Sequence, residues 1–214
     1  MAYTLANLQD DIRNYTEVDD GVLTTGILNT MIKNSENKIY RESDAFNLKC
    51  IISDVDGNKY CVRERAKLEM AADLLAQVTT KMTALVDYMN ENHGDQERVK
   101  RLVKNFDPDS ISETLPTSKL TAYSENKGEK IAFCLNKSKD GNKLIDMETL
   151  TFVAIHELSH VMSLDIGHGD EFWTNFKYLL ENAEKAGIYK NIDYKETPQT
   201  YCGMEITDNP YFDY

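Results

Sequence analysis

Two histidines and a glutamate stand close together in the C-terminal half of the chain, as His156, Glu157 and His160. On a helix, residues four apart share a face with their Cβ atoms about 5–6 Å apart, so both imidazoles can reach one zinc ion. Glu157 lies about 100° round the helix from His156, near enough to take a proton from a water at that ion. The spacing therefore predicts a hydrolytic Zn²⁺ centre, with the histidines as ligands and Glu157 as the general base. The competing interpretation is a buried helix whose histidines are only hydrogen-bonded.

A third ligand is needed, because a catalytic zinc site takes three protein ligands and leaves one position open. On a straight helix His168 would lie about 12 Å beyond His160, too far for a shared ion. Gly167 permits a left-handed break, so the chain can turn back and bring His168 to the metal. We favour His168 because imidazole suits zinc. Three acidic residues are rival ligands and candidates to orient a ligating ring: Asp165, Asp170 and Glu171.

The elements that must position this cluster follow from the apolar spacing and the turn residues. Asp146 is a plausible N-cap for the motif helix, and a second helix runs from about residue 170 to 186. The stretch "KIAFCL" at residues 130–135 is the second strand of a predicted hairpin. It is either an edge that pairs with an extended substrate or an ordinary interior strand. Three downstream tyrosines could stabilise an oxyanion, and the sequence does not choose among them: Tyr189, Tyr194 and Tyr201.

The rest of the chain predicts an α+β fold, with a small antiparallel sheet packed on the active-site helix. A hairpin turns at Asp56–Gly57, and a long helix spans about residues 63–92. The long helix has one apolar stripe, formed by Met70, Leu74, Val78, Met82, Leu85 and Met89. A short basic helix follows at residues 96–106, then a loop at 107–118. Residues 1–45 form a separate helical segment, and residues 46–214 form the main domain.

Composition narrows the function classes. The net charge of −12 repels phosphate backbones, so nucleic acid is not an expected partner. No apolar run reaches the roughly 18 residues of a membrane span, and the N-terminus shows no signal peptide, so neither a membrane nor secretion is expected. The four cysteines form no C-x-x-C pair, and we interpret them as free thiols in a reducing compartment: Cys50, Cys61, Cys134 and Cys202.

The stretch "HELSHVMSLDIGHGDEFW" at residues 156–173 resembles the signature of minimal zinc peptidases of the WLM, SprT-like and YgjP-like group, an HExxH motif with a later histidine. The resemblance implies a minimal zincin-like domain with His156, His160 and His168 on zinc and Glu157 as general base. Residues 64–210 are also similar to metallopeptidases of large DNA viruses and some phages. Residues 8–43 resemble the N-terminal helices of neck or tail-connector proteins in tailed phages.

The leading hypothesis is a viral or phage-encoded zinc endopeptidase that acts on a protein or peptide substrate in the host cytoplasm or the virion. The alternative is a structural virion protein, a neck or tail adaptor that docks through residues 1–45 and carries an assembly-related or vestigial metal site. A third hypothesis, a DNA–protein crosslink protease, is suggested by relatives in the same group. Only the basic residues between Arg98 and Lys104 favour it against the acidic net charge.

Overall fold

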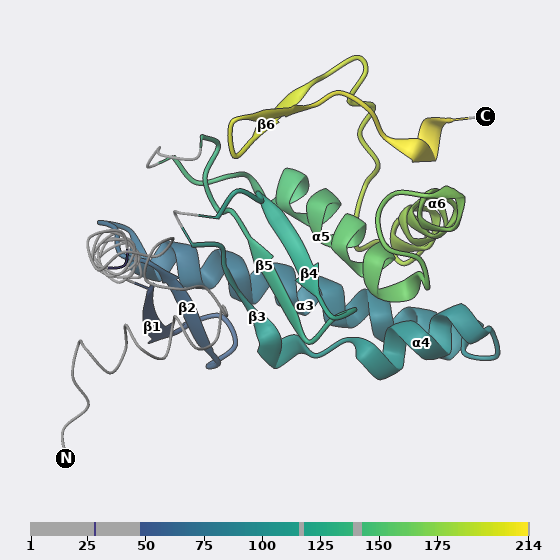
Figure 1. Cartoon of the computed structure of the whole chain (residues 1–214), viewed down its shortest axis with the longest axis horizontal. Coiled ribbons are helices and arrows are strands. Elements are labelled where there is room, and N and C mark those ends of the chain that lie inside the picture. The colour runs from purple at the N-terminus through teal and green to yellow at the C-terminus, as the bar shows by residue number, and fades with distance from the viewer. Residues whose placement is uncertain (1–27, 29–47, 116–117, 139–142, 214) are drawn as a thin grey trace. The chain divides into compact units, whose positions relative to one another are not determined.

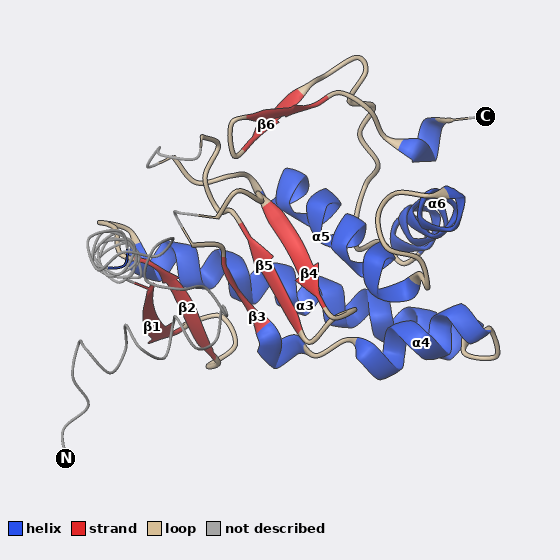
Figure 2. Ribbon diagram, in the orientation of Figure 1, coloured by secondary structure: helices blue, strands red, loops and turns tan. Residues whose placement is uncertain are grey.

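The computed structural model describes residues 28, 48–115, 118–138 and 143–213. The helices predicted within residues 1–45 lie outside the described residues, Leu28 excepted, so the division of the chain at residue 45 stays a prediction. The elements, in chain order, are β1 (Leu48–Ile52), β2 (Lys59–Arg63), α3 (Leu68–His93), α4 (Glu97–Asn105), η1 (Pro108–Ser110), β3 (Ile111–Glu113), β4 (Ala122–Glu125), β5 (Lys130–Phe133), α5 (Met147–Met162), α6 (Asp170–Lys185), β6 (Gln199–Tyr201), β7 (Met204–Ile206) and η2 (Pro210–Phe212). Figures 1 and 2 show their arrangement. This mixture of small sheets and helices confirms the predicted α+β class.

The central sheet has three strands in the order β3–β5–β4. The predicted hairpin of β4 and β5 is antiparallel, with Ala122 opposite Phe133. The sheet is not wholly antiparallel, however, because β3 pairs with β5 in parallel. β3 lies in the segment predicted to be a loop. It has only three residues, too few for an alternating pattern to stand out in the sequence.

The predicted hairpin of β1 and β2 is confirmed, and Gly57 adopts a positive φ of 74° in its turn. Its register places Cys50 opposite Cys61, and these two residues form a disulfide. A second disulfide joins Cys134, just after β5, to Cys202 in the turn between β6 and β7. The prediction of free thiols is therefore wrong, and the inference of a reducing compartment loses its basis. The folded chain brings together cysteines that are 11 and 68 residues apart in the sequence.

Helix α3 packs on α5 and on the neighbouring strands, and Figure 1 shows it crossing behind the central sheet. The predicted apolar stripe is buried from Val78 to Met89, and Leu74 is partly buried. Met70 is 55% exposed, because the buried face of the helix begins one residue later, at Ala71. Helix α5 is buried almost all round, since it contacts α3, α4, α6 and the edge strand β4. No helix in the described ranges is both long and apolar enough to cross a membrane.

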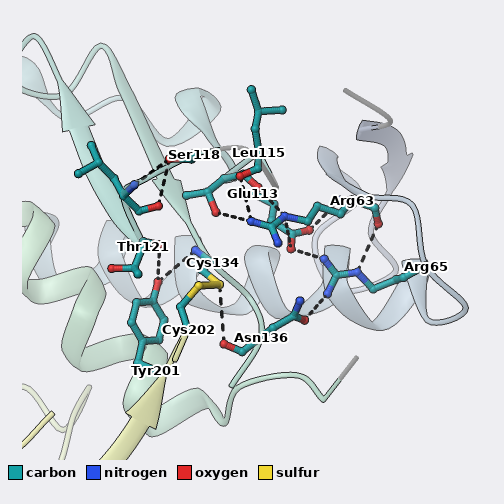
Figure 3. A network of polar contacts seen from close by, with 12 residues as sticks. Arg63, Arg65, Glu113, Leu115, Ser118, Thr121, Cys134, Asn136, Tyr201 and Cys202 are labelled. Atoms are coloured by element: carbon teal, nitrogen blue, oxygen red, sulfur yellow. Dashed lines mark hydrogen bonds and ion pairs between the residues drawn. A yellow bond between two sulfur atoms is a disulfide. The ribbon is translucent and has the colours of Figure 1, made fainter. Parts of the chain in front are cut away.

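A buried ionic network joins β2 to β3 (Figure 3). Glu113 is 1% exposed and accepts a hydrogen bond from the backbone N–H of Arg63 at 2.7 Å. It also pairs with the guanidinium groups of Arg63 and Arg65. Burial raises the pKa of Glu113, and the two arginines oppose that effect. Arg63 also donates to Thr114 O at 2.7 Å and Arg65 to Asn136 Oδ1 at 2.8 Å, so the network fixes the first hairpin to the central sheet.

Candidate metal centre

Helix α5 begins where the sequence predicts. The Asp146 side chain accepts hydrogen bonds from Thr149 N at 2.9 Å and from Thr149 Oγ1 at 2.6 Å, which is an N-cap arrangement. The last two turns of this helix carry His156, Glu157 and His160. A rigid, capped and buried helix therefore fixes the directions of all three side chains.

The turn after α5 brings the chain back toward the helix. Gly167 has a positive φ of 90°, the left-handed break expected before His168. Glu171 at the start of α6 accepts from Leu164 N at 2.9 Å and Asp165 N at 3.3 Å. Arg101 of α4 donates to Met162 O at 2.7 Å and to Glu171 at 3.1 Å, which connects the end of α5 to the start of α6. One predicted rival ligand, Glu171, thus holds the turn in place.

The three imidazoles converge on one point. The Nε2 atoms of His160 and His156 are 3.2 Å apart, and each lies 3.1 Å from Nε2 of His168. Three nitrogens held about 2.0–2.1 Å from one zinc ion at tetrahedral angles would be separated by roughly 3.3–3.4 Å. The observed triangle is close to that size, so the donor set fits Zn²⁺. Asp165, Asp170 and Glu171 do not belong to this cluster.

The surroundings favour neutral imidazoles, the form that binds a metal. Burial, followed by the neighbouring histidines, lowers the pKa of His156 to about 3. Burial, then His168 and Lys127, lowers the pKa of His160 to about 4. The Phe172 ring packs behind the cluster, with its centroid 4.8 Å from His156, 4.4 Å from His160 and 4.5 Å from His168. The cluster is thus already arranged to receive a cation.

Glu157 is 3% exposed, and burial raises its pKa to about 8. Its Oε2 atom is buried and has no hydrogen-bond partner within the described part of the chain. A buried carboxylate oxygen without a partner costs free energy, and such atoms in folded proteins call for an explanation. A water at a neighbouring metal ion would supply the missing donor.

The strand beside the centre is β4. β5, which contains "KIAF", lies between β3 and β4. Of the two predictions for this strand, an interior strand is therefore right and a substrate-binding edge is wrong. A cavity of about 610 Å³ runs along β4 past the three histidines and Glu157. Ser124 and Lys127 also line it, and Lys127 donates to His160 O at 3.4 Å and to Asp165 O. The unpaired edge available to an extended peptide therefore belongs to β4.

Of the three candidate tyrosines, only Tyr201 lines a cavity at the centre. Its hydroxyl accepts from Cys134 N at 3.1 Å and donates to Thr121 O at 3.2 Å (Figure 3). These bonds occupy the hydroxyl, so Tyr201 holds the start of β4 instead of pointing a free donor at a substrate. The hydroxyls of Tyr189 and Tyr194 bond each other at 3.1 Å inside the core. None of these three tyrosines is thereby placed as the oxyanion donor.

Sequence reasoning missed the side chains that hold the turn. Arg101 lies on the predicted basic helix, and its side chain donates to Met162 O at the end of α5 and to Glu171. Asn175 donates to Ser163 Oγ at 3.0 Å from the next helix. These contacts join residues that lie far apart in the sequence or on different helices, and no local pattern marks them.

Comparisons with known proteins show a domain family and several viral proteins to which this chain is similar. The model of the WLM domain matches residues 61–210. A protein of Acanthamoeba polyphaga mimivirus is 30% identical over 161 residues, which cover 73% of this chain and 81% of that protein. A protein of Invertebrate iridescent virus 6 is 33% identical over 82 residues, 38% of this chain and 44% of that protein. The crystal structure of Wss1 from Saccharomyces cerevisiae shares 24% identity, with a TM-score of 0.44, over 57% of this chain and 86% of that chain. The predicted resemblance to WLM proteins and to proteins of large DNA viruses is thus confirmed.

Proposed function

Because this chain belongs to the WLM domain family, we propose that it is a zinc-dependent endopeptidase. In this proposal His156, His160 and His168 hold the ion, and Glu157 is the general base. The observation that supports it best is the convergence of three Nε2 atoms within 3.2 Å of one another. The partnerless, buried Oε2 of Glu157 supports it independently.

Each group has a distinct part in peptide hydrolysis. A zinc ion bound by the three imidazoles would lower the pKa of a water to about 7 and polarise the scissile carbonyl. Glu157 accepts a proton from the attacking water and returns it to the leaving amine. Its burial suits this task, since desolvation raises the pKa of the carboxyl and so favours uptake of the proton. The Phe172 ring is 1% exposed and packs against the imidazole of His160, so it keeps water away from that side of the histidine cluster.

The edge of β4 gives the substrate a place to bind. An extended peptide can add to an open strand edge through main-chain hydrogen bonds, which do not depend on its sequence. Such binding requires an extended segment, and unfolded or flexible parts of a protein adopt that conformation most easily. We therefore expect protein segments in extended conformation to be the substrates.

A chelation experiment tests the proposal. The full chain, loaded with one equivalent of zinc, is incubated with casein as an unfolded substrate, and new N-termini are identified by mass spectrometry. We expect cleavage to stop on removal of the metal with a chelator and to return when zinc is restored. Absence of cleavage by protein with confirmed full zinc occupancy would contradict the proposal.

A further inference from the structure

Lys127 places a positive charge at the wall of the cavity that contains the histidine cluster. It lies in the turn between β4 and β5, beside α5 (Figure 1), and adopts a positive φ of 62°. A lysine in this left-handed conformation is uncommon, because the backbone crowds its Cβ atom. Its ammonium donates to His160 O at 3.4 Å and to Asp165 O. The charge is therefore held next to the backbone of one candidate metal ligand.

The ammonium group has a hydrogen-bond donor to spare. A lysine side chain carries three N–H groups and one positive charge. Within the described ranges its acceptors are two backbone carbonyl oxygens, and no carboxylate forms an ion pair with Lys127. A partly buried charge without a counter-charge costs free energy, and a carboxylate from a ligand would recover part of that cost.

The nearest carboxylates do not neutralise this charge. Burial lowers the pKa of Lys127, and Glu171 and Asp165 oppose that effect only in part. Glu171 pairs with Arg101 at 3.1 Å, and neither acid lines the cavity. The positive charge of Lys127 is therefore available to a group that enters the cavity.

The cavity itself contains few charged groups. Apart from the three imidazoles, Lys127 and Glu157 are its only ionisable lining residues that carry a cation or a carboxyl group. Glu125 and Glu129 lie in the same hairpin, but both are exposed and neither lines the cavity. A zinc ion on the histidines would add two positive charges. The cavity therefore suits an acidic group, although the chain as a whole carries a net charge of −12.

The position of Lys127 limits which part of a substrate it can contact. Its ammonium bonds the backbone carbonyl of His160, so it lies roughly the length of a histidine side chain from the metal position. An extended peptide advances about 3.3 Å per residue, so a group that reaches the ammonium lies within about three residues of the cleaved bond. This limit is the same for both directions of a peptide along β4.

We propose that Lys127 is a specificity-determining residue that binds the carboxylate of an aspartate or glutamate side chain in the substrate. The proposal rests on the peptidase function and adds to it a class of cleavage site: bonds with an acidic residue at one nearby position. Charge-assisted hydrogen bonds are about twice as strong as neutral ones. Loss of one such bond at a solvent-accessible site should weaken binding by about tenfold.

Paired peptides measure the effect of the substrate charge. A site that the zinc-loaded full chain cleaves in casein is rebuilt as peptides, with glutamate or glutamine at each of the three positions on either side of the bond. The two side chains have nearly the same shape, so the difference between them reports on charge. At one position we expect glutamate to exceed glutamine by about tenfold in kcat/KM.

Variants of Lys127 test whether this side chain recognises the charge. The advantage of the glutamate peptide should disappear in Lys127→Met and persist in Lys127→Arg, and Lys127→Glu should prefer a lysine peptide. The control is Lys104→Met, because Lys104 is exposed on α4 and does not line the cavity. Each ratio is measured on one protein preparation, so a partial loss of zinc or of folded protein cancels.

A binding measurement separates this inference from the peptidase function. A labelled peptide with glutamate at alternate positions and its glutamine counterpart are titrated with the zinc-loaded Glu157→Gln variant, and binding is followed by fluorescence anisotropy. Adding Lys127→Met to this variant should reduce the affinity advantage of the glutamate peptide by about tenfold.

The possible results lead to different conclusions. Cleavage with no position at which glutamate exceeds glutamine would overturn the inference and leave the peptidase function standing. A preference that persists in Lys127→Met would also overturn it, because the zinc ion or another group would then bind the carboxylate. Absence of cleavage at full zinc loading would reject the peptidase function, and an unchanged affinity advantage in the double variant would reject the carboxylate site.

Discussion

Glu157 differs from Glu171 in that its buried Oε2 has no hydrogen-bond partner among the residues that the structure describes. Glu171, by contrast, pairs with Arg101 and accepts from the amides of the turn. A carboxylate that stabilises the fold is expected to have such partners, and Glu157 does not. This difference at the level of single residues is why we assign proton transfer to Glu157 and a structural part to Glu171.

Replacing Glu157 by glutamine tests that assignment. The amide has nearly the same shape but cannot accept a proton, so peptidase activity should fall by about 10²- to 10⁴-fold. Zinc content and thermal stability should be retained. Glu148→Gln is the control, because Glu148 is exposed at the start of the same helix. The activity is measured by casein digestion. Unchanged activity in Glu157→Gln would show that Glu157 is not the general base.

At the level of elements, the turn between α5 and α6 decides whether a third histidine can reach the first two. Gly167 has a positive φ of 90° with open space around its Cα, whereas Gly169 has an ordinary φ of −76°. The two glycines therefore differ in backbone conformation and not in crowding. A side chain added at Gly167 would therefore be strained, whereas one added at Gly169 would not.

This contrast yields a matched pair of variants. Gly167→Ala should cost about 1–2 kcal/mol in the conformation that presents His168, and should weaken zinc binding by roughly tenfold. Gly169→Ala should bind zinc as the wild type does. The measurement is a zinc titration against a competing chelator. Equal affinities in the two variants would show that the turn does not have to hold this conformation for the metal to bind.

Much of the fold could be predicted from local sequence, because helices and hairpins are specified by neighbouring residues. The caps, the breaks and the apolar spacing placed α3, α4, α5, α6 and the two hairpins around Gly57 and residues 126–129. Short strands were missed, since β3, β6 and β7 each have three residues, too few for a period to emerge.

The candidate site was also predictable in part. The spacing of His156, Glu157 and His160 and the glycine before His168 led directly to the cluster that the fold forms. The edge strand and the turn-holding role of Arg101 were not predictable, because they arise from contacts between distant segments. The Cys50–Cys61 pair could have been found, since the predicted turn at Gly57 sets these cysteines opposite each other.

At the scale of the whole molecule, two basic side chains of α4, Arg98 and Arg101, contact other elements of the fold. The Arg98 guanidinium lies 3.7 Å from the ring centroid of Tyr178 and donates to Asn175 Oδ1 at 3.3 Å. Arg101 is bound to Met162 and Glu171, and Lys100 pairs with Glu97 at 2.7 Å. These contacts, together with a net charge of −12, weaken the one feature that favoured a crosslink protease acting directly on DNA. Docking to a virion through residues 1–45 stays a prediction.

The ionic network of Glu113 joins distant parts of the described unit and should matter for global stability. In Glu113→Gln the guanidinium groups of Arg63 and Arg65 lose a buried counter-charge, which should cost about 3 kcal/mol of the free energy of unfolding. The control is Glu97→Gln, because its exposed pair with Lys100 should have no measurable effect on stability. Urea unfolding of both variants is the measurement. A Glu113 variant as stable as the wild type would show that the network contributes nothing net.

The most direct measurement is the zinc content of the purified full chain, compared with that of two histidine variants. We predict about one zinc per chain for the wild type and for His93→Ala, since His93 bonds Asn182 on α6 and lies outside the cluster. His168→Ala should lose most of its zinc, because it keeps only the two helical ligands. Full zinc content in His168→Ala, or none in wild type after reconstitution, would contradict the three-histidine centre and with it the proposed peptidase.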